Sequence, residues 1–121
     1  MVDISLFEEL SKVNGYMGAV LSDFTGEILV SDASKVKSLD ETSMRFNEDF
    51  RSIHEMTNKL GLGHTKTMEV NADNATIVMI CGGADARVHL HAFVIMTKDG
   101  SVGLAKMALK NLVDKATAEL S

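Results

Sequence analysis

Residues 15–30 run Gly15-Tyr16-Met17-Gly18-Ala19-Val20-Leu21-Ser22-Asp23-Phe24-Thr25-Gly26-Glu27-Ile28-Leu29-Val30, two apolar segments on either side of a turn-forming group. The first segment, residues 15–21, is apolar on both of its alternating faces, which predicts a strand buried on both sides. Residues 23–26 suit a turn, and residues 27–30 suit the short second strand of a hairpin. The segment therefore predicts a β-hairpin as the first part of a sheet.

A short helix is predicted before this hairpin and a longer one after it. The first fits about three turns, because Asn14-Gly15 supplies a stop after apolar residues at helical spacing, namely Ile4, Leu6, Phe7, Leu10 and Val13. Beyond the polar connector, residues 38–41 match the capping box Ser-x-x-Glu, although Thr42 or Ser43 can equally accept the first amide hydrogens. A middle helix that ends at Gly61 is predicted by the apolar stripe Phe46, Phe50, Ile53, Met56 and Leu60.

Three more strands and a closing helix complete the predicted order. Residues 64–70 alternate in polarity as a half-buried strand does, and residues 75–81 and 88–97 are longer apolar strands. After the turn Asp99-Gly100, one face of a helix is formed by Leu104, Ala105, Ala108, Leu109, Leu112, Val113, Ala116 and Leu120. The order αββαβββα predicts an α+β fold with a five-stranded antiparallel sheet, whose two faces the three helices can cover.

The composition is that of a globular protein. The chain has 121 residues, of which 45% are hydrophobic and 24% charged, so we expect a single domain over residues 1–121 with a real apolar core. Its formal net charge is -5. Because an acidic protein needs a segregated basic patch to bind phosphate backbones, and the sequence has none, nucleic acid is not an expected partner.

The sequence also favours a cytoplasmic protein. Cys81 is the single cysteine, so no internal disulfide can form, as expected in a reducing compartment. Asp3, Glu8 and Glu9 stand where a signal peptide has a basic start and an apolar run. The apolar runs are also far shorter than the roughly 18 residues of a membrane span. We therefore expect neither a signal peptide nor membrane insertion.

Two histidines and the cysteine are candidate metal ligands. His89 and His91 lie two positions apart on a predicted strand, so their rings share a face and can reach one ion, with Cys81 as a possible third ligand. The same face carries Phe93 and Ile95, which favours the alternative of a strand end that emerges from the core. Cys81, among apolar neighbours, equally suits a small buried residue. The prediction is therefore that the protein has no metal ligands and no cofactor.

Catalytic signatures are absent from the sequence. It contains no P-loop, no Gly-x-Ser-x-Gly elbow, no His-Glu-x-x-His helix and no dinucleotide-binding fingerprint, which predicts a protein without enzymatic activity. Arg87 follows the turn-forming residues 82–86 and is the best-placed arginine for contact with a partner, because an arginine supplied in trans can accelerate GTP hydrolysis. The alternative is a solvated hairpin side chain.

Two motifs, together with the order of the elements, carry a family resemblance over nearly the whole chain. The first is residues 15–23 with the following Thr25-Gly26-Glu27-Ile28-Leu29-Val30-Ser31-Asp32, and the second is Asp99-Gly100-Ser101-Val102-Gly103-Leu104-Ala105-Lys106 at the start of the last helix. In these features the chain resembles the Roadblock/dynein light chain (Roadblock/LC7) family. The resemblance implies a sheet like that of profilin and longin domains, with the middle helix on one face and the two terminal helices on the other.

The resemblance also implies a homodimer, in which the two middle helices pack across the symmetry axis and the third strands join edge to edge. Such proteins typically lack catalysis and serve as platforms or regulators for Ras-like small GTPases, or as adaptors on the dynein motor. We therefore predict a non-enzymatic cytoplasmic homodimer that binds a Ras-like GTPase and changes its nucleotide state or localisation. The alternatives are a dynein-type adaptor light chain and a metal-binding enzyme or sensor that uses His89 and His91.

The predicted dimer contact uses the middle helix and the strand after it. If the apolar stripe covers the sheet, the seam lies on a partly polar flank, either that of Asn47, Phe50 and His54 or that of Arg45, Asp49, Ser52 and Met56. The strand is an open edge for backbone pairing unless Lys66 and Glu69 protect it. The residues assigned to the interface are Asn47, Phe50, His54, Thr65, Thr67 and Glu69, with Arg87 as the partner-binding residue.

Overall fold

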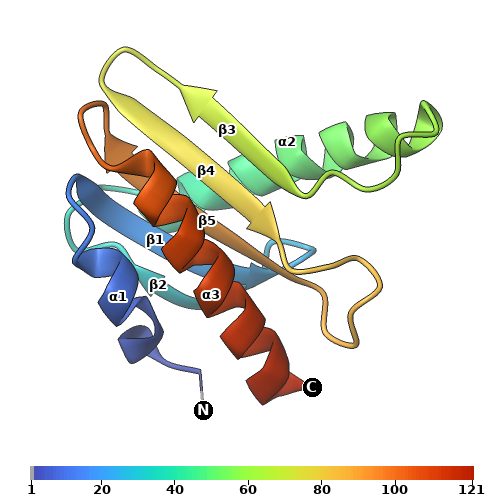
Figure 1. Cartoon of the computed structure of the whole chain (residues 1–121), viewed down its shortest axis with the longest axis horizontal. Coiled ribbons are helices and arrows are strands. Elements are labelled where there is room, and N and C mark those ends of the chain that lie inside the picture. Colours follow the sequence, from blue (N-terminus) through green and yellow to red (C-terminus); the bar gives the residue numbers. More distant parts are fainter. Residues whose placement is uncertain (1) are drawn as a thin grey trace.

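Five antiparallel strands form a sheet in the order β2-β1-β5-β4-β3, with helices on both faces (Figure 1). The computed structural model describes residues 2–121, so Met1, which the predicted domain 1–121 includes, lies outside the described residues. The strands are β1 Tyr16–Asp23, β2 Ile28–Asp32, β3 Thr67–Asn71, β4 Ala75–Cys81 and β5 Leu90–Thr97. The helices are α1 Glu8–Ser11, which follows the 3-10 turn η1 Ile4–Phe7, then α2 Leu39–Lys59 and α3 Val102–Leu120. The predicted order and the antiparallel sheet are confirmed.

Each face of the sheet carries its own apolar core, because alternate residues of the central strands point to opposite sides. On the side of α1 and α3, the core includes Phe7, Leu10, Leu21, Val94, Met96, Leu109 and Val113. On the side of α2, it consists of Val20, Leu39, Phe50, Met79, Cys81 and Phe93 with partly buried neighbours. The predicted placement of one helix on one face and two on the other is therefore confirmed.

The first helix is shorter than predicted. The three-turn helix expected from residue 4 to residue 13 is one 3-10 turn followed by α1, which ends at Ser11. The chain must turn between residues 12 and 15 to enter β1, and Gly15 has a φ of 92° at this turn. A Cβ on Gly15 would lie 2.5 Å from the Gly100 Cα, so two turns of the backbone pack against each other here.

The predicted capping box at the start of the middle helix is wrong. Ser38 is the N-cap, but its φ is 59° and its side chain makes no capping hydrogen bond. The Ser43 hydroxyl donates to the Asp40 carbonyl instead of accepting an amide hydrogen. The left-handed backbone at Ser38 turns its hydroxyl away from the first free amides, which the sequence pattern cannot reveal.

The predicted apolar stripe of the middle helix is only half buried. Phe50 is fully buried and Phe46 packs against the same core, but Met56 and Leu60 are 55% and 73% exposed. Figure 1 shows the reason, since the C-terminal end of α2 reaches past the start of β3 and has no sheet beneath it. The predicted end is confirmed, because Gly61 follows the helix with a φ of 75°.

No helix of the described residues is long and apolar enough to cross a membrane.

Candidate functional site

The antiparallel register of β4 and β5 brings Cys81 and His91 side by side, and His89 lies next to them just before β5. The His89 Nε2 atom is 3.1 Å from the Cys81 Sγ and 3.2 Å from the His91 Nε2. The donor atoms of all three residues lie within 4.8 Å of one another. The sequence prediction that the two histidine rings share a face therefore holds, although His89 precedes the strand on which it was expected.

Asn47 of α2 determines which nitrogen of His91 carries the proton. The Asn47 amide nitrogen donates to the Phe24 carbonyl at 3.0 Å, so its oxygen faces the His91 Nδ1 at 2.7 Å. Since an amide oxygen only accepts, His91 must donate through Nδ1. The lone pair of its Nε2 is therefore directed toward His89. Asn47 and His91 lie 44 positions apart, and no local pattern in the sequence indicates their contact.

Burial keeps the two histidines and the cysteine uncharged. His91 is only 3% exposed, and desolvation lowers its pKa to about 3. Desolvation, followed by the positive charge that His54 can carry, also lowers the pKa of His89. Burial raises the pKa of the Cys81 thiol, against a smaller opposite effect of the Gly83 amide that donates to the sulfur. At neutral pH, the cluster therefore contains two neutral imidazoles, which are the form that ligates metals.

The other two of the four histidines in the chain lie beside this cluster. The rings of His54 and His64 stack with centroids 4.6 Å apart, and the His54 Nε2 is 2.8 Å from the His64 Nδ1. The His54 ring centroid is 6.4 Å from that of His89. Sequence reasoning placed His54 at a dimer seam and missed this gathering, because the rings come from α2, from the segment after it and from the start of β5.

Phe24 and Arg51 form the outer side of the cluster. The Phe24 ring stacks on His89 with centroids 4.9 Å apart and an angle of 6° between the rings. The Arg51 guanidinium lies 5.7 Å above the centre of the Phe24 ring. Because Phe24 is an exposed residue and His89 is half-buried, the cluster reaches the surface of the protein at this point.

The predicted interface residues fall into two groups. Asn47 and Phe50 are 1% and 0% exposed, because their own chain already covers them. Thr65 precedes β3 and shares a hydrogen bond with Thr57, whereas Thr67 and Glu69 are exposed on β3. The other flank that the sequence suggested is exposed in full, from Arg45 and Asp49 through Ser52 to Met56. The flank of α2 that faces outward is therefore the one that carries these four residues.

The backbone groups of β3 alternate between those that face β4 and those that face away from the sheet. The Lys66 carbonyl accepts from the Cys81 amide, and the Ala72 amide donates to the Ala75 carbonyl, so both point toward β4. Because backbone groups alternate along an antiparallel strand, those of Thr67, Glu69 and Asn71 point away from the sheet. This open row of donors and acceptors is the feature that β-sheet proteins use for pairing with another strand.

Arg87 lies exposed in the connection between β4 and β5. Its guanidinium makes no ion pair with any residue in the described part of the chain.

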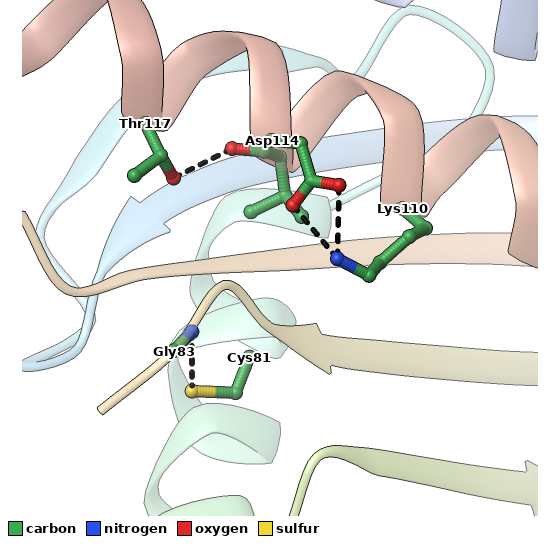
Figure 2. Close-up of polar contacts among 6 residues, drawn as sticks. Cys81, Gly83, Lys110, Asp114 and Thr117 are labelled. Carbon is green, nitrogen blue, oxygen red and sulfur yellow. Dashed lines mark hydrogen bonds and ion pairs between the residues drawn. The ribbon is translucent and has the colours of Figure 1, made fainter. Parts of the chain in front are cut away.

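A pocket of about 570 Å³ lies between the ends of β3 and β4 and the facing side of α3. Figure 2 shows Cys81 and Gly83 where β4 ends, with Lys110, Asp114 and Thr117 on α3. Two of the three lysines that line it are neutralised: Lys110 binds both Asp114 oxygens, at 2.8 and 2.9 Å, and Lys106 pairs with Glu69. The pocket thus presents little uncompensated positive charge for an anionic ligand.

Neither a protein-family model nor a curated protein sequence matches the chain. A solved Roadblock/LC7 domain from Streptomyces avermitilis matches its structure with a TM-score of 0.83, at 16% identity and over 98% of both chains. The chain has the Roadblock/LC7 fold. A structure of MglB in a tetrameric arrangement matches with a TM-score of 0.81, at 16% identity over 95% of this chain and 85% of that one.

The same fold extends to profilin. Profilin IA from Acanthamoeba castellanii matches with a TM-score of 0.63, at 8% identity and over 97% of both chains. The predicted Roadblock/LC7 resemblance and the profilin-like architecture are therefore both confirmed. Because one fold can carry several functions, the function of this Roadblock/LC7-like chain must be argued from its own surfaces.

Proposed function

We propose that the protein is a non-enzymatic cytoplasmic homodimer that binds a Ras-like small GTPase and changes its nucleotide state or localisation. The observation that carries this proposal is the open edge of β3, which is the last strand of the sheet in a Roadblock/LC7 fold. An exposed edge strand is rarely left unprotected, because its free amides and carbonyls pair readily with another chain. The tetrameric arrangement described for MglB adds support for self-association.

Pairing of two β3 strands about a two-fold axis joins both sheets into one. The outward groups of Thr67, Glu69 and Asn71 then find partners in the second copy, as an isologous contact requires. Glu69 is paired with Lys106 of its own chain, so its charge repels a second strand less than a free carboxylate would. This pair weakens the alternative that Glu69 serves to protect the edge.

The outward flank of α2 supplies the second part of the proposed interface. Arg45 and Asp49 carry opposite charges on this flank, and Met56 and Leu60 add apolar surface near its end. Opposite charges on one self-complementary surface can pair across a two-fold axis, and exposed apolar side chains gain from burial. This partly polar seam takes the place of the one through Asn47 and Phe50, whose side chains lie inside the protomer.

Three measurements test the proposed function. Sedimentation velocity at micromolar concentration is expected to find dimers, and pull-downs with Ras-like GTPases from the same organism are expected to retain one of them. Hydrolysis assays with the retained GTPase then compare the wild type with Arg87→Ala, because the exposed arginine is free to reach a bound partner. Loss of stimulation in this variant indicates that Arg87 acts on the bound GTPase as an arginine supplied in trans. Unchanged binding and hydrolysis indicate that the protein serves as a scaffold. Single subunits throughout, or no GTPase bound, contradict the proposal.

A further inference from the structure

We propose that Cys81, His89 and His91 form a Zn²⁺ site with three protein ligands and a fourth position open to solvent. The proposal concerns the cluster on the α2 side of the sheet and depends neither on dimer formation nor on a GTPase. It assigns an ion-binding site to the protein and no reaction.

Two of the three distances between the donor atoms are close to those around a tetrahedral zinc ion. Zn–N bonds of about 2.05 Å and a Zn–S bond of about 2.3 Å at tetrahedral angles place two nitrogens about 3.3 Å apart and nitrogen and sulfur about 3.6 Å apart. The corresponding distances here are 3.2 Å between the two Nε2 atoms and 3.1 Å from the His89 Nε2 to the Cys81 Sγ. The third pair, from His91 and Cys81, lies within 4.8 Å, so side-chain rotations that adjust these distances admit the ion.

The His91 ring is already oriented for ligation. Its Nδ1 donates to the Asn47 oxygen, and the Asn47 amide cannot turn over without losing its hydrogen bond to the Phe24 carbonyl. Ligating histidines in metalloproteins typically use their second nitrogen in this way, because the hydrogen bond holds the ring and keeps the coordinating lone pair free. Asn47, which is 1% exposed, is therefore a positioning residue for the site.

The sulfur has a partner that supports its ionised form. The Gly83 amide donates to the Cys81 Sγ at 3.4 Å, and Figure 2 shows the two residues at the end of β4. When Zn²⁺ binds, the Zn–S bond replaces the S–H bond and the thiol proton leaves to solvent. The two neutral imidazoles coordinate without a net change in their protonation. A thiolate with two imidazoles is a donor set that selects zinc over the hard cations Mg²⁺ and Ca²⁺.

We place the fourth position on the side of His89, because His89 is half-buried whereas Cys81 and His91 are buried. His89 is half-buried between Phe24 and His54, whereas His54 and His64 are engaged with each other at 2.8 Å. We assign this position to water, because neither surface histidine has a donor atom grouped with the other three. Three protein ligands and one exchangeable position are typical of zinc sites that accept an exogenous ligand.

The test uses the full-length, reduced, metal-free protein and titrates it with Zn²⁺ by calorimetry and with Co²⁺ by absorption spectroscopy. One ion per chain is expected, with the ligand-field spectrum of tetrahedral Co²⁺ and a thiolate-to-cobalt charge-transfer band. Because Cys81 is the single cysteine, that band can arise from no other residue. Cys81→Ser is expected to abolish it, and His89→Ala, at a half-buried position, to weaken binding by about 100-fold or more, beyond the 10- to 100-fold effect of losing a supporting residue.

Three further variants separate this site from a surface histidine pair. His64→Gln is the matched control and is expected to leave the affinity within about threefold. Asn47→Ala is expected to weaken binding about 10- to 100-fold. Asn47→Asp keeps an acceptor for the His91 Nδ1 but loses the donor to the Phe24 carbonyl, so it is expected to weaken binding less than Asn47→Ala does. Thermal melts check that each variant is folded. Absence of binding, a spectrum without the thiolate band, or binding that survives His89→Ala and is lost in His64→Gln overturns the proposal.

Discussion

Asn47 joins three segments that lie far apart in the sequence. From α2 it bonds to the Phe24 carbonyl in the turn after β1 and to His91 on β5. The turn closes directly over it, since a Cβ on Gly26 would lie 3.2 Å from the Asn47 Nδ2, and Gly26 has a φ of 97°. A single buried amide thus holds a helix, a turn and a strand in register.

Asn47→Ala is expected to lower the free energy of unfolding of the metal-free protein by about 2–4 kcal/mol, because it leaves one buried and one partly buried hydrogen-bond partner without Asn47. Chemical denaturation measures this loss. Asn58→Ala is the control, because Asn58 is an exposed residue of the same helix, and its effect should stay within about 0.5 kcal/mol. Equal losses in the two variants would contradict the assigned role of Asn47.

Tyr16 and Asp32 form a second polar contact, between β1 and the end of β2. The Tyr16 hydroxyl donates to an Asp32 oxygen at 2.7 Å, and this hydrogen bond holds the pKa of Asp32 below its ordinary 3.8. The unfolded state therefore binds the proton more tightly than the folded state does. The stability from this contact is present above about pH 4 and is lost as the pH falls through the folded pKa.

Tyr16→Phe is expected to lower the free energy of unfolding by about 1 kcal/mol at pH 7, the size of one partly exposed hydrogen bond to a charged group. The difference from the wild type should shrink as the pH falls below about 4 and Asp32 becomes protonated. Urea denaturation across this range measures it. In an Asp32→Asn background, the Tyr16 substitution should have the same effect at every pH, and a persistent pH dependence there would refute the link.

At the scale of elements, β3 is one of the two edge strands, so half of its backbone groups have no partner in the sheet. In β3 and at the residues on either side of it, the backbone groups of even-numbered positions from 66 to 72 point toward β4. The Glu69 amide therefore points outward. Proline, which has no amide hydrogen, is tolerated where that hydrogen faces solvent and not where it joins a ladder. Proline substitutions at the neighbouring positions 69 and 70 can therefore distinguish an effect on edge pairing from an effect on folding.

Glu69→Pro is expected to leave the protomer folded and to weaken self-association by about tenfold or more, since one outward donor is removed. Val70→Pro is expected to lower the free energy of unfolding by about 3 kcal/mol, because it removes a bond to β4. Sedimentation and chemical denaturation measure the two effects. Glu69→Ala keeps the amide and loses only the side-chain contacts with Lys106 and Asn71. Dimers that are lost in Glu69→Ala as well would therefore point to the side chain instead of the edge.

At the scale of the whole molecule, one sheet separates two apolar cores, and β2 and β3 form its two edges. The open side is that of β3, where α2 extends past the sheet and leaves Met56 and Leu60 exposed (Figure 1). Unpaired backbone and uncovered apolar side chains thus occur together on one side of the protein, which is the combination expected of a surface that a second copy covers.

If the native state is this dimer, its stability must depend on concentration. A tenfold increase in protein concentration adds about 1.4 kcal/mol to the free energy of unfolding per dimer, which corresponds to a rise in Tm of roughly 2–5 °C. Calorimetry at two concentrations tests this expectation. The Glu69→Pro variant should show a smaller rise, and a Tm of the wild type that does not change with concentration would contradict the dimer.

The order of helices and strands, the two-sided burial of β1 and the glycine stop after α2 could all be predicted from the sequence. These features depend on the spacing of apolar residues within one segment, and that spacing acts over a few neighbouring positions. The predictions that were wrong concern positions whose environment depends on the backbone conformation or on contacts with distant parts of the chain. Ser38 has a capping residue type but a left-handed backbone, and Leu60 continues an apolar stripe where the sheet has ended.

The candidate ion site shows the same division more sharply. His89 and His91 lie two residues apart, so the sequence alone determined that their rings share a face, whereas the register of β4 and β5 placed Cys81 beside them. Only the tertiary structure decided that Asn47 orients one ring, that Phe24 stacks on the other and that His54 and His64 lie beside them. These residues come from separate elements, and long-range packing of helix, turn and strand, not local periodicity, brings them together.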